Sequence, residues 1–137
     1  MDEDRARNPD AQGWGERADE GAGDLTVDVA GHSRTRVLRV RGELDIAVAP
    51  GLLPRVPELV AGAPGVVLDL AAVTFFDSAG VRLVDRLARE CGRAGVPFAV
   101  VARPGTTPAR VLQIVGFGPP LVTPDLAAGL EAVRDPA

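Results

Sequence analysis

The sequence predicts a single α/β domain with a mixed central β-sheet and about four helices packed against it. Short apolar runs of strand character alternate with segments of helical periodicity, in the order β-β-α-β-α-β-α-β-α. Only a short glycine-containing turn separates the first two strands, which favours an antiparallel hairpin, whereas the later strands are joined through helices and should run mainly parallel. With 137 residues, of which 46% are hydrophobic and 25% are charged, the chain can bury one core.

The first residues differ from the rest in charge. Residues 1–24 hold eight acids and three arginines (3 − 8 = −5), whereas the remaining 113 residues hold twelve arginines and eleven acids (12 − 11 = +1). This segment is rich in glycine and has almost no large apolar residue, so it cannot bury enough surface to offset the entropy of ordering. We therefore expect a disordered acidic tail over 1–23 and a folded domain over 24–137. The acidic tail and the near-neutral domain argue against nucleic acid as a partner.

The cysteine count and the apolar runs indicate the compartment. The single cysteine, Cys91, cannot form an internal disulfide and lies on the apolar side of a predicted helix, which favours a buried thiol in a reducing compartment. No apolar run is long enough to span a bilayer, and the N-terminus lacks the hydrophobic core of a secretion signal. The sequence therefore predicts a soluble, cytoplasmic protein that makes no membrane contact.

The domain begins with two strands and a proline-rich helix. Apolar residues alternate with polar ones from Leu25 to Val29, as in a half-buried strand, and a second strand over 37–40 ends at the segment 42–45. Apolar residues in 46–61 have helical spacing, but two internal prolines each remove a backbone donor. We therefore predict a helix there that is kinked or partly irregular.

A buried strand then turns into the longest helix. The apolar run 66–70 predicts a strand covered on one or both faces, a second small apolar set follows, and Asp77 and Ser78 are preferred helix caps. The helix should run from Ser78 to about Arg93 and end at Gly95. The Ser78 hydroxyl would then lie at the positive end of the helix dipole, although capping alone would explain both residues. The predicted apolar stripe of this helix contains Val81, Val84, Leu87, Ala88 and Cys91.

The last third supplies two more strands and two helices. A short core strand is predicted at 97–101, and a hydroxyl just before Pro108 indicates the start of a helix that ends at 116–118. An edge strand at 121–122 and a terminal helix from Leu126 to about Val133 complete the sheet and its cover.

Three short segments of the sequence together resemble a known protein family. They are Gly42-Glu43-Leu44-Asp45, Val67-Leu68-Asp69-Leu70 and Val73-Thr74-Phe75-Phe76-Asp77-Ser78-Ala79-Gly80, and a weaker match is made by Pro108, Arg110, Leu112 and Gly116. With them, residues 25–133 resemble a STAS domain, and most resemble the small single-domain anti-sigma-factor antagonists of bacteria.

The resemblance implies a phosphorylation switch that regulates transcription. In such antagonists the unmodified form binds an anti-sigma factor that is also a serine kinase, and so frees a sigma factor. The kinase uses ATP to phosphorylate the serine that follows the aspartate, which releases the antagonist, and a PP2C-type phosphatase resets it. Carried onto this chain, the phosphorylation site is Ser78, and the protein itself has no catalytic residue, metal or cofactor. We expect a monomer, with a weak dimer as the alternative.

The expected partner surface surrounds the start of the long helix. Gly80 is expected to keep the first helical turn slim enough for a partner to approach. The sequence departs from the usual family pattern at Val48, at Ala79 and at Val81-Arg82. The expected partner-binding residues are Asp77, Ser78, Ala79 and Gly80, with Glu43, Asp45, Thr74, Arg82 and Asp85 at the rim.

Two other classes of function stay open at this point. STAS domains also serve as constitutive interaction subunits, either scaffolds or components of lipid-transport machines, and are then not switched by phosphorylation. An enzyme is the weakest alternative: Asp45, Asp69 and Asp77 suggest an acid cluster, but no metal spacing, nucleophile–base pair or glycine-rich phosphate loop accompanies them. Asp45 and Asp69 are interpreted as turn or strand-end residues.

Overall fold

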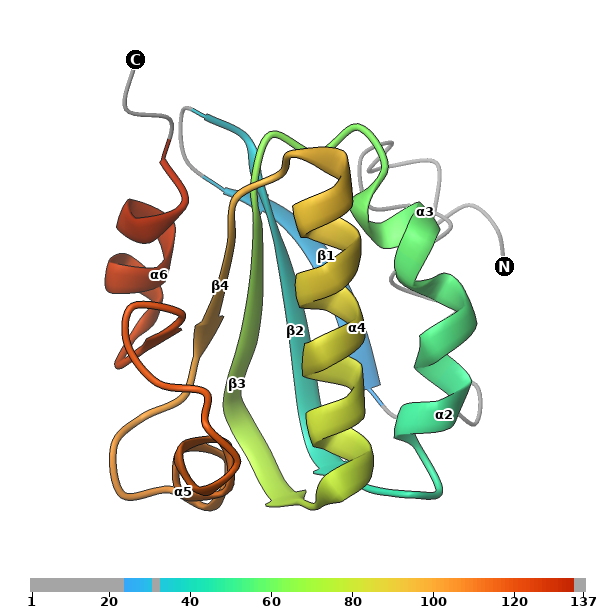
Figure 1. Ribbon diagram of the computed structural model, residues 1–137, viewed down its shortest axis with the longest axis vertical. Helices are drawn as coiled ribbons and strands as arrows, with labels where there is room; N and C mark the ends of the chain where they lie inside the picture. Colours follow the sequence, from blue (N-terminus) through green and yellow to red (C-terminus); the bar gives the residue numbers. More distant parts are fainter. Residues whose placement is uncertain (1–23, 31–32, 135–137) are drawn as a thin grey trace.

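The central sheet has five strands. The computed structural model describes residues 24–30 and 33–134, so the acidic tail expected at 1–23 lies outside the described residues. The strands lie in the spatial order β1-β2-β3-β4-β5 (Figure 1). β1 and β2 pair antiparallel, and the other pairs are parallel, so the predicted mixed sheet and α/β class are confirmed. The strands are β1 (Asp24–Ala30), β2 (Thr35–Leu44), β3 (Val66–Phe76), β4 (Phe98–Val101) and β5 (Val122–Thr123).

The helical residues between β2 and β3 form three short pieces rather than one helix. Each piece has a proline at its first or second position, namely Pro50, Pro54 and Pro57. Because proline has no N–H and is tolerated only in a first turn, each proline starts a new piece, as predicted for an irregular helix. These pieces are α2 (Ala49–Leu52), the 3₁₀ turn η2 (Leu53–Arg55) and α3 (Val56–Val60).

Helices lie on both faces of the sheet. The other helices are α4 (Ser78–Ala94), α5 (Thr107–Ile114) and α6 (Leu126–Ala132). Figure 1 shows α2, α3 and α4 in front of the sheet and α6 beside β4. Alternate residues of β3 serve the two faces: Leu68 and Leu70 belong to the larger core under α4, and Val67 belongs to a smaller core with Val133.

Helix α4 is framed as the sequence predicts. It begins at Ser78 and is followed by Gly95 in the left-handed conformation, with φ +72°. Its buried side is different in detail from the predicted stripe, because Leu83 is buried whereas Val81 and Ala88 are only partly covered. Cys91 is buried as predicted, and burial, followed by the charge of Glu90, raises the pKa of its thiol to about 12.

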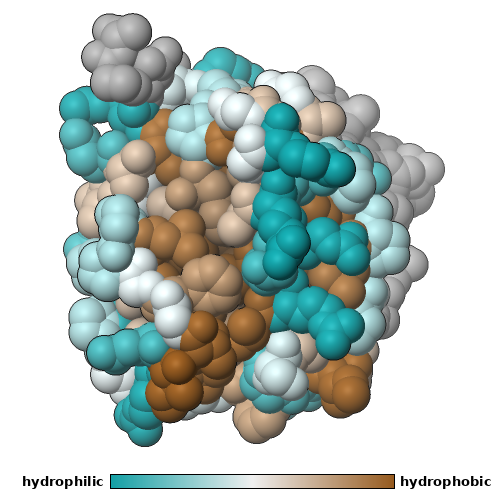
Figure 2. Space-filling view, viewed as in Figure 1, coloured by the Kyte–Doolittle hydropathy of each residue, from teal (hydrophilic) through white to brown (hydrophobic). Residues whose placement is uncertain are grey.

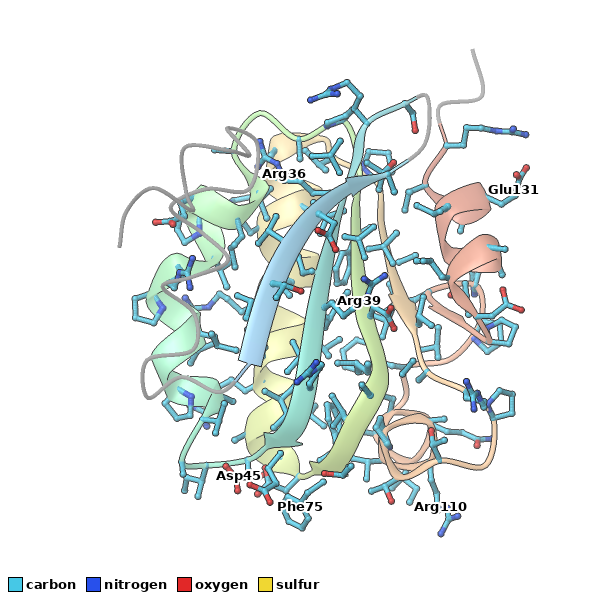
Figure 3. The ribbon with its side chains drawn as sticks, turned by 180° about the vertical axis from the view of Figure 1, so that it is seen from behind. Arg36, Arg39, Asp45, Phe75, Arg110 and Glu131 are labelled. Atoms are coloured by element: carbon cyan, nitrogen blue, oxygen red, sulfur yellow. The ribbon has the colours of Figure 1, made fainter. Side chains whose placement is uncertain are left out.

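Asp69 corrects one interpretation of the sequence. It lies within β3 and is buried, rather than at a strand end, because β3 continues to Phe76. Its Oδ2 accepts from Arg39 Nε at 3.1 Å, and its Oδ1 accepts from the backbone N–H of Ala71 at 2.9 Å. Arg39 lies on the sheet face seen from behind in Figure 3 and also contacts Asp28 on β1 at 3.2 Å. The buried carboxylate is therefore paired and hydrogen-bonded, as its desolvation requires.

The start of α5 differs from what the sequence predicts. The hydroxyl expected to cap α5 does not do so: the N-cap is Thr106, whose Oγ1 donates to the carbonyl oxygen of Arg103 at 2.6 Å.

Within the part of the chain that the structure describes, every helix is too short or too polar to cross a membrane.

Candidate functional site

The ends of two parallel strands bring the predicted site together. Leu44, the last residue of β2, is the register partner of Phe76, the last residue of β3. Asp45 and Asp77 follow directly, so both carboxylates lie at the same edge of the sheet. Figure 3 shows Asp45 and Phe75 next to each other at this edge. The carboxyl edge of a parallel sheet is where α/β domains usually place their binding residues.

Each of these aspartates begins a helical segment. Asp77 is the N-cap of α4 in an extended conformation, and its Oδ1 accepts from the backbone N–H of Ala79 at 2.9 Å. Oδ1 of Asp45 accepts from the backbone N–H groups of Ala47 at 3.0 Å and Val48 at 3.2 Å, just before α2. Val48, the N-cap of α2, makes no side-chain cap, and the Asp45 carboxylate instead stabilises the turn that leads into α2.

Ser78 is the first residue of α4, and its side chain is exposed. It faces a shallow depression of ≈290 Å³ between the α2 region and the start of α4. The side chains that line it are mostly apolar, and one of them carries a positive charge. The lining residues are Ile46, Pro50, Leu53, Ser78, Ala79 and Arg82. An exposed hydroxyl thus sits in the open, within reach of another protein.

The structure gives Gly80 a different role from the expected one. Gly80 is buried, and a Cβ at this position would lie 2.6 Å from Cε1 and 2.8 Å from Cδ1 of Phe76. The glycine is therefore needed for packing of the helix on the aromatic ring. Gly80 lies beneath the exposed surface, and its expected part in partner binding stays a prediction.

Of the other predicted residues, only Ala79 and Arg82 line this depression. Glu43 and Thr74 are exposed near the ends of β2 and β3, and Arg82 is exposed one turn after Ser78. Asp85 lies two turns along α4, about 10 Å from Ser78 by helical rise, and accepts from Arg89 Nε at 2.8 Å. Asp85 and Arg89 thus form an i,i+4 ion pair on the surface of α4.

Two exposed apolar residues were not in the predicted site. Ile46 is 77% exposed and Phe75 is 47% exposed at the same edge of the sheet. The apolar residues with helical spacing in this segment lie at 52–60, and Ile46 stands apart from them, which is the signal that the sequence offers. An exposed Phe next to a buried one, Phe76, was not readable from the alternation, because β3 has lost its regular pairing there. Large exposed apolar side chains beside a polar centre are typical of protein-binding surfaces.

The acid cluster considered for an enzyme is not assembled. Asp45 and Asp77 are used as backbone acceptors, and Asp69 is buried in β3 beside Arg39. Across residues 24–30 and 33–134, no group of three or more His, Cys, Asp or Glu residues is placed to hold a metal ion. Among the described residues, this edge of the sheet therefore offers a hydroxyl, a cation and apolar walls, which suit binding to another protein.

Comparison with known proteins gives a consistent result. The STAS domain profile matches residues 26–126. The anti-sigma-F factor antagonist RsfB of Mycobacterium tuberculosis is 37% identical over 94 residues, which are 68% of this chain and 75% of that protein. The crystal structure of an anti-sigma factor antagonist from Mycobacterium paratuberculosis superposes with a TM-score of 0.68 at 34% identity, covering 82% of this chain and 96% of that one. Unphosphorylated SpoIIAA, 21% identical with a TM-score of 0.63 over 74% of this chain and 88% of that one, shares the fold.

Proposed function

The chain belongs to the STAS domain family, and from that premise we propose that it is an anti-sigma-factor antagonist switched by phosphorylation of Ser78. In the unmodified state it binds an anti-sigma factor that is also a serine kinase, and the bound anti-sigma factor releases its sigma factor. The named relatives at 34–37% identity, both anti-sigma factor antagonists, support the first half of this proposal. The observation that carries the second half is the exposed hydroxyl of Ser78 on the first turn of an aspartate-capped helix.

The switch would work through charge. The Ser78 Oγ attacks the γ-phosphorus of ATP on the kinase; the new O–P bond forms as the bond to ADP breaks, and the hydroxyl proton passes to a base of the kinase. The product carries about −1.5 to −2 charges at pH 7. A helix N-terminus tolerates that charge inside the antagonist, so the domain stays folded.

The same charge would be costly in the complex. A partner surface shaped for a neutral hydroxyl and for apolar Ile46 and Phe75 would have to desolvate the phosphate next to Asp77. A hundredfold loss of affinity needs only about 2.8 kcal/mol, which one uncompensated buried charge can supply. Phosphorylation therefore breaks the complex without unfolding the protein.

The remaining parts of the proposal follow from this role. The protein acts in the cytoplasm as a regulator without catalytic activity or cofactor of its own, ATP being consumed by the kinase. A PP2C-type phosphatase returns Ser78 to the hydroxyl form. Asp77, Ala79, Arg82, Glu43, Asp45, Thr74 and Asp85 form the proposed contact surface around Ser78.

One observation favours a second candidate, a constitutive interaction subunit such as a scaffold or a lipid-transport component. Ile46 and Phe75 are exposed at the same edge as Ser78 and could hold a partner regardless of the state of the serine. Equal binding of one native partner by Ser78→Ala and Ser78→Asp would favour this candidate over the switch.

The proposal is tested by incubating the protein with its cognate kinase and ATP and mapping the phosphate by mass spectrometry. We expect a single phosphate on Ser78 and none on the Ser78→Ala variant. Thr107→Ala removes an exposed hydroxyl from the first position of another helix, α5, outside the proposed contact surface, and is the matched control, so it should be phosphorylated like the unaltered protein. Undiminished phosphate on Ser78→Ala would sink the assignment.

A further inference from the structure

An uncompensated positive charge lies one helical turn from Ser78. Arg82 is exposed and lines the same ≈290 Å³ depression as Ser78. Within the described residues, neither Arg82 nor Arg86 has an acidic partner, whereas Arg89 and Arg93 on the same helix are paired with Asp85 at 2.8 Å and Glu90 at 2.6 Å. Figure 2 shows the hydrophilic side chains of this helix as a teal band with apolar surface on both sides.

The described acids on α4 and on the segments packed against it that lie close to Arg82 in the chain or in the fold already have other partners. Asp77 accepts from the backbone of Ala79, and Asp85 is paired with Arg89. On the elements packed against α4, the Asp45 carboxylate is used before α2, and Glu58 of α3 lies 3.7 Å from Arg55. The remaining walls of the depression, Ile46, Pro50 and Leu53, are apolar. As far as the described residues show, a dianion arriving at the depression would therefore meet a cation that is not already paired with an acid.

We propose that Arg82 pairs with the phosphate of phosphorylated Ser78 and holds it in this depression. Residues at i and i+4 of a helix are neighbours, so the guanidinium of Arg82 can reach a phosphate on Ser78 across one turn. A guanidinium donates two parallel hydrogen bonds to phosphate oxygens, and it does so better than the ammonium of lysine. The inference rests on the proposed phosphorylation of Ser78.

The pairing has a consequence for release. In the unmodified protein, Arg82 presents a cation that is paired with no acid of residues 24–30 and 33–134, and the depression presents apolar walls to a partner. In the phosphorylated protein, the phosphate fills the depression and pairs with that cation. Neither the cation nor the apolar walls are then available to a partner. Arg82 would thus set how completely phosphorylation changes this surface.

The test uses the full chain with phosphoserine incorporated at position 78 during translation, without kinase or anti-sigma factor. The pH titration of the phosphate is followed by ³¹P NMR in three proteins: the unaltered chain, Arg82→Gln and Arg86→Gln. A nearby cation stabilises the dianion and lowers the second pKa of the phosphate. We expect this pKa to be lower by about 0.5 in the unaltered chain than in Arg82→Gln, as for an exposed ion pair.

The control variants separate pairing from general charge. Arg86→Gln removes the same charge from the same exposed face one turn farther away and should titrate like the unaltered chain. Arg82→Lys keeps the positive charge but loses the two parallel hydrogen bonds of the guanidinium. The second pKa of its phosphate should lie between those of the unaltered chain and Arg82→Gln. If Arg82→Gln titrates like the unaltered chain, or if Arg86→Gln shifts the phosphate as much as Arg82→Gln does, the pairing is refuted.

Failure of the pairing and failure of the proposed function give different experimental results. A kinase that ignores Ser78 would remove the switch while the titration still measured the pairing. A phosphate insensitive to Arg82, in a protein whose Ser78 is phosphorylated by its kinase, would refute the pairing alone.

Discussion

The starts of α4 and α6 have the same local chemistry. Each has an aspartate at the N-cap whose carboxylate accepts a backbone N–H, from Ala79 at 2.9 Å and from Ala128 at 2.8 Å. Each also has a buried glycine in its first turns, Gly80 and Gly129, where a Cβ would lie under 3.0 Å from a core side chain. These shared features are requirements of capping and packing, and they confer no function by themselves.

The two starts differ in the residue after the cap. In α6 it is Leu126, which is partly buried and packs against the smaller core. In α4 it is Ser78, exposed beside a depression with apolar walls and Arg82. The comparison indicates that the functional signal of α4 is the exposed hydroxyl and its neighbours, not the cap or the glycine that accompany it.

The largest effect on stability is expected from adding a side chain at the buried glycine of α4, Gly80. Gly80→Ala would bring a Cβ to 2.6 Å from the ring of Phe76, which is only 3% exposed and cannot easily move. Because three ring atoms would lie within 3.0 Å of the new Cβ, we take the upper end of the usual overpacking cost, about 3 kcal/mol. The better helix propensity of alanine offsets about 1 kcal/mol of it, which leaves an expected loss of about 2 kcal/mol. Urea denaturation measures it.

The corresponding variant in α6, Gly129→Ala, should have a smaller effect. A Cβ on Gly129 would lie 2.9 Å from one methyl of Val101, a milder conflict than the three ring atoms within 3.0 Å at Gly80. Gly129→Ala should therefore cost less than Gly80→Ala. If Gly80→Ala were as stable as the unaltered protein, the packing role assigned to Gly80 would be wrong.

A smaller effect is expected from removing the two caps. Asp77→Ala and Asp125→Ala should each lower the free energy of unfolding by about 1 kcal/mol, because each leaves a first-turn N–H without its acceptor. Asparagine caps nearly as well as aspartate, so Asp77→Asn and Asp125→Asn should restore most of this stability.

The two caps should differ in their effect on binding. In folded protein, only the changes at Asp77 should alter binding to the anti-sigma factor, since Asp125 lies at the other helix start. Equal effects on binding at both caps, measured by calorimetry at a temperature where all variants are folded, would show that the distinction between the two starts is mistaken.

The fold was largely readable from the sequence because its signals are local. Alternation, caps such as Asp77 and terminators such as Gly95 depend on neighbours within a few residues, and the structure has the predicted elements in the predicted order. Asp69 was misread because β3 runs past it to Phe76, through a region where its pairing with β2 shifts register. Such irregularities depend on the partner strand, and one sequence does not show them.

The site was only partly readable for the same reason. Ser78 and Arg82 both fall outside the predicted apolar stripe of α4, and both are exposed. The burial of Gly80 depends on the ring of Phe76, and the wall formed by Ile46 and Leu53 depends on how the proline-broken segment packs against α4. These are tertiary contacts between segments about 30 residues apart or joined by a strand-to-helix turn, and periodicity does not encode them.

The measurement that bears most directly on the central claim is the affinity of the full chain for its cognate anti-sigma factor, with Ser78 unmodified and with phosphoserine at that position. Isothermal titration calorimetry of both forms, with Ser78→Ala as a control for the loss of the hydroxyl, provides it. We predict tight binding by the unmodified form and by Ser78→Ala, and binding at least about a hundredfold weaker by the phosphorylated form. Equal affinities of the unmodified and phosphorylated forms would contradict the account.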